Sequence, residues 1–130
     1  GQLHNLARLY WYTVEFGLIR ENGGLRIYGA GILSSPQETV FALEDESPNR
    51  IGYNVQRLMR TKYLIDDFQQ TYFVVDSFGD LLETCYQDFG SIYAEVKDLP
   101  DLQAHEIAPD DEILHLGTHT YFNMNGRKMV

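Results

Sequence analysis

Residues 4–16 carry the pattern that most restricts the fold, because apolar side chains recur there with a helical period. Apolar or small side chains occupy the i, i+3, i+4, i+7 and i+8 positions: Leu6, Leu9, Tyr10, Thr13 and Val14. Gly17 follows, where a helix C-terminus favours a residue that can adopt a positive φ. We therefore expect a helix over residues 4–16, with its aromatic side chains completing a small core.

The rest of the chain alternates between short helical and short extended segments. Ser35 is typical of an N-cap, Pro36 of a first helical position, and Glu38 closes a capping box, so a helix is expected to about residue 43. A polar turn is expected at residues 21–24. Further helices are expected at residues 51–59 and 78–89, and strands at residues 25–28, 63–65, 71–75, 113–116 and 120–122. The pattern indicates an α+β fold in which helices dominate the first two-thirds.

Composition and charge exclude several classes of protein. With 130 residues the chain has the length of one domain, and 19 acidic against 10 basic residues give a net charge of -9, which a phosphate backbone would repel. The one cysteine, Cys85, excludes an internal disulfide framework. The apolar runs are too short to span a bilayer, and residues 1–10 lack a basic leader and an apolar signal core. We expect a cytoplasmic protein with neither nucleic-acid nor membrane partners.

Glu15 is the residue that packing alone does not explain. Four residues share one stripe of the expected helix: Ala7, Trp11, Glu15 and Leu18. An ionised carboxylate on such an apolar surface costs several kcal/mol unless it is paired or bound to a metal. Two interpretations remain open. Glu15 either lies partly wet at the helix end, bonded to Arg20 or Arg26, or is a functional carboxylate.

Three segments, taken in order, resemble the pterin-dependent aromatic amino acid hydroxylases. YWYTVEFGL at residues 10–18 is followed by YGAGILSS at residues 28–35, and DFQQTYFV at residues 67–74 is similar to the bacterial phenylalanine 4-hydroxylase branch. The resemblance covers most of residues 6–80 and is weaker beyond them. It implies the mainly helical catalytic fold of that family with short strands, and residues 1–130 would be the C-terminal portion of a single catalytic domain.

The resemblance also implies chemistry. Members of the family use non-haem Fe(II), tetrahydrobiopterin and O2 to hydroxylate an aromatic ring, and two histidines and one glutamate hold the iron. Glu15 would be that glutamate, with Fe(II) compensating its charge, and Tyr10 would border the iron and the pterin. The amino-acid substrate pocket would be lined by Trp11, Phe16, Gly31, Ser34, Ser35 and Glu38. Ser34 would also help to orient a metal-bound histidine. The implied reaction is phenylalanine 4-monooxygenation, with L-phenylalanine and O2 as partners.

The chain departs from the family pattern in its histidines. The family's His-Asp-x-x-x-His motif is absent, and we expect all four histidines to be solvated or structural: His4, His105, His115 and His119. The family's pterin loop and the arginine that holds the substrate carboxylate also have no match. We therefore expect this chain alone to be inactive. The alternative is a non-catalytic binding or assembly module that retains part of the fold.

Assembly can be predicted from the last residues. Residues 117–130, GTHTYFNMNGRKMV, contain no heptad repeat from which a tetramer-forming helix could be built. The complete protein is therefore expected to be a monomer. For the isolated chain we expect weak self-association through the apolar face of the first helix, formed by Leu6, Leu9, Tyr10 and Val14.

Overall fold

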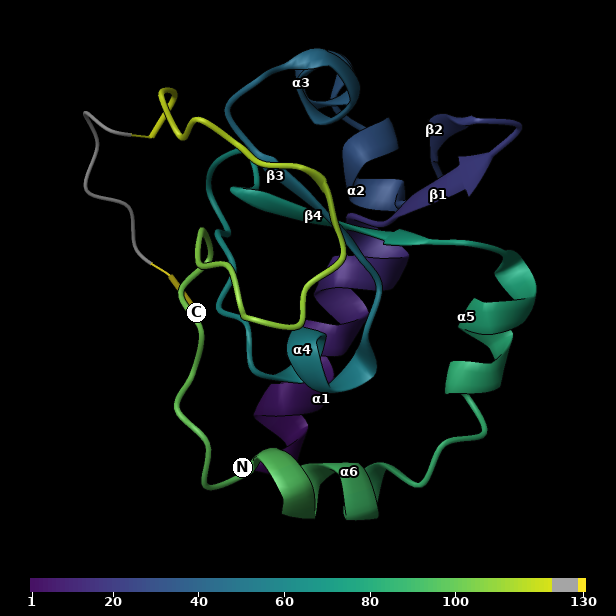
Figure 1. Ribbon diagram of the computed structural model, residues 1–130, viewed down its shortest axis with the longest axis vertical. Coiled ribbons are helices and arrows are strands. Elements are labelled where there is room, and N and C mark those ends of the chain that lie inside the picture. The colour runs from purple at the N-terminus through teal and green to yellow at the C-terminus, as the bar shows by residue number, and fades with distance from the viewer. Residues whose placement is uncertain (123–128) are drawn as a thin grey trace.

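A mixed five-stranded sheet runs through the centre of the computed structural model (Figure 1), which describes residues 1–122 and 129–130. The strands are β1 (Leu18–Glu21), β2 (Gly24–Ile27), β3 (Asn49–Gly52), β4 (Thr71–Val75) and β5 (Ile113–His115). Their order is β2-β1-β4-β3-β5. The central strand β4 pairs in parallel with both β1 and β3, whereas β2 and β5 close the two edges with antiparallel pairings.

Helices cover both faces of this sheet. The chain begins with α1 (Gln2–Tyr10) and continues without a break into the π-helix η1 (Trp11–Glu15). The later helices are α2 (Ala30–Leu33), α3 (Pro36–Glu44), α4 (Val55–Met59), α5 (Phe78–Thr84) and α6 (Phe89–Val96). In Figure 1, α2 and α3 lie on one side of the sheet, and α1 and α4 lie on the other. Within the described ranges, no helix combines the length and the apolar character needed to cross a membrane.

Strand β4 separates two hydrophobic cores, because successive side chains of a strand point to opposite faces. Tyr72 and Val74 point toward α2 and α3, where they join the first core: Phe16, Leu18, Ile32, Phe41, Ala42, Leu64, Tyr72, Val74 and Phe122. Phe73 points toward α1 and α4, where it joins the second core: Leu9, Tyr12, Ile51, Leu58, Met59, Tyr63 and Phe73. The uninterrupted apolar run of β4 is thus the mark of a strand buried on both faces.

The first helix differs from the expected one at its C-terminal end. The Phe16 amide donates to the Trp11 carbonyl at 2.9 Å, a bond between residues five apart, so α1 gives way to a π-turn after Tyr10. Leu18 belongs to β1, and the expected stripe with Ala7 and Trp11 therefore ends before it.

Gly17 is needed for close approach, and the expectation of a positive φ there is wrong. Positive φ occurs, among described residues, at Asn22, Gly23 and His119. A Cβ on Gly17 would lie 2.2 Å from the Tyr28 ring and 2.5 Å from the Thr13 carbonyl oxygen.

Several expected elements are confirmed. Thr71–Val75 is β4, the turn at residues 21–24 joins β1 and β2, and Ser35 caps α3 by accepting from the Glu38 amide at 3.2 Å. The α+β class is confirmed as well. The strand expected at residues 113–116 is β5, one residue shorter.

Other expected elements are wrong in type or extent. The helix expected at residues 51–59 is the strand β3 followed by α4. In place of the single helix expected at residues 78–89 there are two helices, α5 and α6. Asp88 caps α6, so a new helix begins at Phe89, and Gly90 lies inside this helix. Residues 63–65 form only one isolated bridge, between Leu64 and Met129, and residues 120–122 form a turn. Positions 123–128 of the heptad-free C-terminal segment lie outside the described residues.

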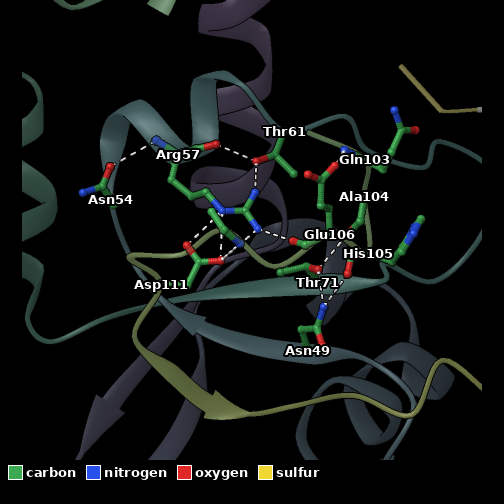
Figure 2. Close-up of polar contacts among 11 residues, drawn as sticks. Asn49, Asn54, Arg57, Thr61, Thr71, Gln103, Ala104, His105, Glu106 and Asp111 are labelled. Carbon is green, nitrogen blue, oxygen red and sulfur yellow. Dashed lines mark hydrogen bonds and ion pairs between the residues drawn. The ribbon is translucent and has the colours of Figure 1, made fainter. Parts of the chain in front are cut away.

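Buried polar side chains fasten the irregular residues 97–112 to the sheet (Figure 2). Arg57 on α4 forms an ion pair with Asp111 at 3.0 Å and also donates to the Glu106 carbonyl. On the neighbouring strands, Thr71 Oγ1 donates to the Ala104 carbonyl at 2.6 Å, and Asn49 Nδ2 donates to the His105 carbonyl at 3.0 Å. These bonds hold residues 97–112 against the sheet although this segment contains no helix or strand, and the chain then enters β5 beside β3.

Candidate functional site

The π-turn brings Tyr10 and Glu15 together. Residues five apart lie on different faces of an α-helix, which turns every 3.6 residues, whereas a π-helix sets them about one turn above each other. The Tyr10 hydroxyl accordingly donates to Glu15 Oε1 at 3.2 Å. This hydrogen bond to the carboxylate raises the pKa of Tyr10. Tyr10 is exposed and Glu15 is half-buried, and the hydrogen bond between them lies at the surface, so the Glu15 carboxylate is accessible to a ligand.

Two glycines bring the N-terminal end of α2 against η1. A Cβ on Gly29 would lie 2.5 Å from the Glu15 carbonyl oxygen. A Cβ on Gly31 would lie 2.8 Å from Phe16 Cζ and 3.0 Å from Glu15 Oε2. Any side chain at position 31 would therefore displace the Phe16 ring or the Glu15 carboxylate.

The structure decides against an arginine partner for Glu15. Arg20 forms an ion pair with Asp76 at 2.6 Å and lies 3.4 Å from Glu112. Within residues 1–122 and 129–130, Glu15 forms no ion pair with Arg20 or Arg26. The arginine pairing is therefore wrong, whereas Glu15 is half-buried at the end of the helix, as the first interpretation expects, and its functional role stays a prediction.

Trp11, at the start of η1, lies between two other rings. Its indole stacks on Phe16 with the ring centroids 4.8 Å apart and on Tyr63 with the centroids 4.5 Å apart. Its Nε1 is buried without a hydrogen-bond acceptor among the described residues. Sequence patterns missed Tyr63, which lies far along the chain in a segment that had been expected to be a strand.

The three remaining pocket candidates surround the start of α3. Ser34 is exposed and donates through its hydroxyl to the Gly31 carbonyl at 2.9 Å, whereas Ser35 is occupied as the cap of α3. Glu38 is only 5% exposed, and its Oε2 accepts from the Tyr72 hydroxyl at 2.6 Å and from the Gln69 amide at 3.2 Å. The carboxylate thus binds β4 and the loop before it, and the reciprocal half of the expected capping box is not formed.

Burial raises the pKa of both groups in the Glu38–Tyr72 pair. Removal from water raises the pKa of the Glu38 carboxyl, and the two hydrogen bonds it accepts offset part of that rise. Burial and the neighbouring Glu38 raise the pKa of Tyr72. Tyr72 therefore remains a neutral donor to Glu38 at physiological pH.

The predicted site residues therefore divide into two groups. Tyr10, Trp11, Glu15, Phe16 and Gly31 contact one another around the end of η1. The other three adjoin them through α2 and the cap of α3: Ser34, Ser35 and Glu38. Their contact with a substrate stays a prediction.

The described residues do not complete an iron site by themselves. Among them, no group of three or more histidine, cysteine, aspartate or glutamate side chains could hold a metal ion. Glu15 is an oxygen ligand of a suitable type with an open side, but a facial site with two histidines requires partners from elsewhere.

Two of the four histidines lie together in the structure, His105 and His119. The His105 and His119 ring centroids are 5.8 Å apart, and burial, together with His105, lowers the pKa of His119. His105 and His119 belong to different segments of the chain, and the hydrogen bonds that hold residues 97–112 against the sheet bring their rings together. Among the described residues, no third histidine, cysteine, aspartate or glutamate joins this pair in a group that could hold a metal ion.

Comparison with known proteins relates this geometry to a family. The model of the family described as biopterin-dependent aromatic amino acid hydroxylase matches residues 1–97. The chain is 57% identical over 127 residues to phenylalanine-4-hydroxylase of Caulobacter vibrioides, covering 98% of this chain and 43% of the relative. It is 52% identical over 117 residues to phenylalanine-4-hydroxylase of Chromobacterium violaceum, covering 90% of this chain and 39% of the relative.

A solved structure gives the same match in three dimensions. The iron- and phenylalanine-bound crystal structure of phenylalanine hydroxylase from Chromobacterium violaceum aligns with a TM-score of 0.85 and 54% identity, covering 88% of this chain and 42% of that chain. This chain therefore spans about two-fifths of the length of the relatives it matches.

Proposed function

Because the chain belongs to the biopterin-dependent aromatic amino acid hydroxylases, we propose that it forms the C-terminal portion of the catalytic domain of a phenylalanine 4-monooxygenase. The reaction would convert L-phenylalanine and O2 to L-tyrosine. The observation that carries this proposal is the accessible Glu15 carboxylate, held by Tyr10 on a π-turn beside the aromatic pair Trp11 and Phe16. When bound, tetrahydrobiopterin would supply the two electrons that reduce the second oxygen atom of O2 to the level of water, and Fe(II) would provide the site at which O2 is activated.

Each side chain near Glu15 then has a proposed role. Glu15 is the anionic iron ligand, and Tyr10 orients its carboxylate on the side where the pterin binds. Trp11 and Phe16 form an apolar wall for the substrate ring, and Gly31 leaves room beside them. Ser34, whose exposed hydroxyl donates to the Gly31 carbonyl, would help to orient a histidine ligand. Ser35 and Glu38 hold the start of α3 at the edge of this pocket.

The remaining ligands would come from the rest of the complete protein. Leu3, Tyr10 and Val14 leave an exposed apolar face on α1 and η1, next to Glu15. Such a face favours a covering layer of protein. We further propose that the complete protein is a cytoplasmic monomer.

A second candidate function is a non-catalytic binding or assembly module. The observation that favours it is the incomplete metal-ligand set among the described residues. The two functions differ in whether this chain supports turnover when the other ligands are supplied.

A chimera tests the proposal. This chain replaces the segment that it matches in the Caulobacter vibrioides phenylalanine-4-hydroxylase, and iron content and tyrosine formation from phenylalanine are measured. We expect the chimera to be active, whereas the isolated chain should neither retain Fe(II) nor form tyrosine. A folded chimera that binds iron poorly and makes no tyrosine would support the non-catalytic module instead.

Glu15→Gln in the chimera tests the ligand. The amide keeps the size of the side chain but removes the anionic ligand, so iron affinity and turnover should fall by about one to two orders of magnitude or more. Glu21→Gln, at the exposed end of β1, is the matched control and should leave both unchanged. Parental iron content and turnover in Glu15→Gln would show that Glu15 is only a surface carboxylate.

A further inference from the structure

We propose that Tyr63 is a positioning residue that holds the Trp11 indole in place and thereby sets the aromatic selectivity of the pocket. This inference rests on the proposed function, because it concerns the same site. Tyr63 lies in the segment between α4 and β4, outside the motifs that indicated the site. Its ring reaches Trp11 through tertiary packing alone.

The contacts place Trp11 between the two cores. Phe16 belongs to the first core and Tyr63 to the second, and Trp11 packs against both. The planes of Trp11 and Tyr63 are inclined by 18°, and those of Trp11 and Phe16 by 30°. The indole therefore stacks on one ring from each of the two cores, which lie on opposite sides of the sheet.

Tyr63 itself is rigidly held. It is 8% exposed, and its carbonyl accepts from the Val130 amide at 2.9 Å. Tyr12 meets its ring edge-on at 6.3 Å, and the Tyr12 hydroxyl donates to the carbonyl of the adjacent Lys62 at 2.5 Å. Tyr12 in turn packs edge-on against Phe73 of β4 at 4.9 Å. The central strand thus braces Tyr63, and Tyr63 braces Trp11.

This arrangement determines what a substrate ring can contact. With Phe16 and Tyr63 stacked on Trp11, an incoming ring meets the indole edge, and aromatic pairs favour such edge-to-face contacts because the ring edge is positive and the face negative. A saturated ring of similar size has no such face. Holding Trp11 in one orientation should therefore favour aromatic over saturated side chains.

Spectroscopy on this chain tests the contact directly, because Trp11 is its one tryptophan. Near-ultraviolet circular dichroism and tryptophan emission are compared for wild type, Tyr63→Phe and Tyr63→Leu, with far-ultraviolet circular dichroism as the folding control. Tyr63→Phe keeps the ring and should preserve the indole band and its emission maximum. Tyr63→Leu should weaken the band and shift the emission to longer wavelength. If Tyr63→Leu does not fold, Tyr63→Met is used in its place, since its flexible side chain fills an irregular gap.

Kinetics on the chimera test the consequence. Tyr63→Leu should raise KM for L-phenylalanine by about 3- to 10-fold with little change in kcat, and should reduce the preference for L-phenylalanine over L-cyclohexylalanine. Tyr63→Phe should leave both the KM for L-phenylalanine and this preference at their wild-type values. Unchanged tryptophan signals in a folded Tyr63→Leu chain, or an unchanged KM and preference in the chimera, would overturn the inference. A wild-type chimera without activity would instead overturn the proposed function, because the spectroscopic comparison does not need turnover.

Discussion

The side chain of Glu38 shows how a single buried carboxylate makes stability depend on pH. Its folded pKa lies above the ordinary value of 4.5, so the folded protein holds a proton more tightly than the unfolded chain. The stabilisation from this group is therefore fully present below about pH 4.5 and is lost as the pH rises through the folded pKa. Once the carboxyl has ionised, the hydrogen bonds from Tyr72 and Gln69 offset part of the cost of burying its charge.

We predict that Glu38→Gln removes this pH dependence. The amide oxygen can still accept from Tyr72 and Gln69, whereas no charge is buried. In urea unfolding from pH 4.5 to 7, the variant should gain stability relative to wild type as the pH rises. Glu44→Gln, at the exposed end of the same helix, should show no such trend. A constant difference between Glu38→Gln and wild type over this range would contradict the burial argument.

At the scale of elements, the connection from η1 to β1 depends on Gly17. We predict that Gly17→Ala lowers the free energy of unfolding by about 1–3 kcal/mol, because its Cβ would overlap the Thr13 carbonyl and the Tyr28 ring. Gly79→Ala in α5 is the control: its Cβ would lie 3.5 Å from Ser77 Oγ, an ordinary contact, so it should raise stability by up to about 1 kcal/mol. Urea denaturation measures both, and equal effects would show that close approach at Gly17 is unimportant.

Elements whose signals are local could be predicted from the sequence. Ser35 with Pro36 marked the start of α3, and the apolar run of residues 71–75 marked β4. Ile51 was misassigned because its spacing to Val55 also fits a helix, and only pairing with Phe73 of β4 decides for a strand. The π-turn at Trp11 could not be predicted, since periodicity over so few residues does not distinguish it from an α-helix.

The candidate site was predictable only in part, for the same reason. The apolar neighbours of Glu15 in the sequence marked it as unusual. Its contacts with Tyr10 and Gly31 depend on the π-turn and on the close packing of α2, which the sequence does not reveal. Partners supplied by distant segments carry no local signal. Tyr63 against Trp11 and Tyr72 against Glu38 are both of this kind.

At the scale of the whole molecule, the two cores leave one face of α1 and η1 uncovered. The expected apolar face included Leu6 and Leu9, but Leu9 is buried in the second core and Leu6 packs against it. The exposed face consists instead of Leu3, Tyr10 and Val14, which are 82%, 52% and 46% exposed. Leu9 is therefore unavailable for self-association while the second core is intact, and Leu6 is half-buried.

We predict that the isolated chain associates weakly through the Leu3–Tyr10–Val14 face and that the chimera, which covers this face, is monomeric. The net charge of -9 opposes contact between copies, and salt screens this repulsion while leaving apolar contacts intact. Sedimentation should therefore show association that strengthens with salt. Replacing Leu3 and Val14 together by lysine should abolish it, whereas Tyr86→Ser, at an exposed position beyond α5, should not. A tetrameric chimera would contradict the monomer, and a chain that stays monomeric at high salt would show that this face does not drive association.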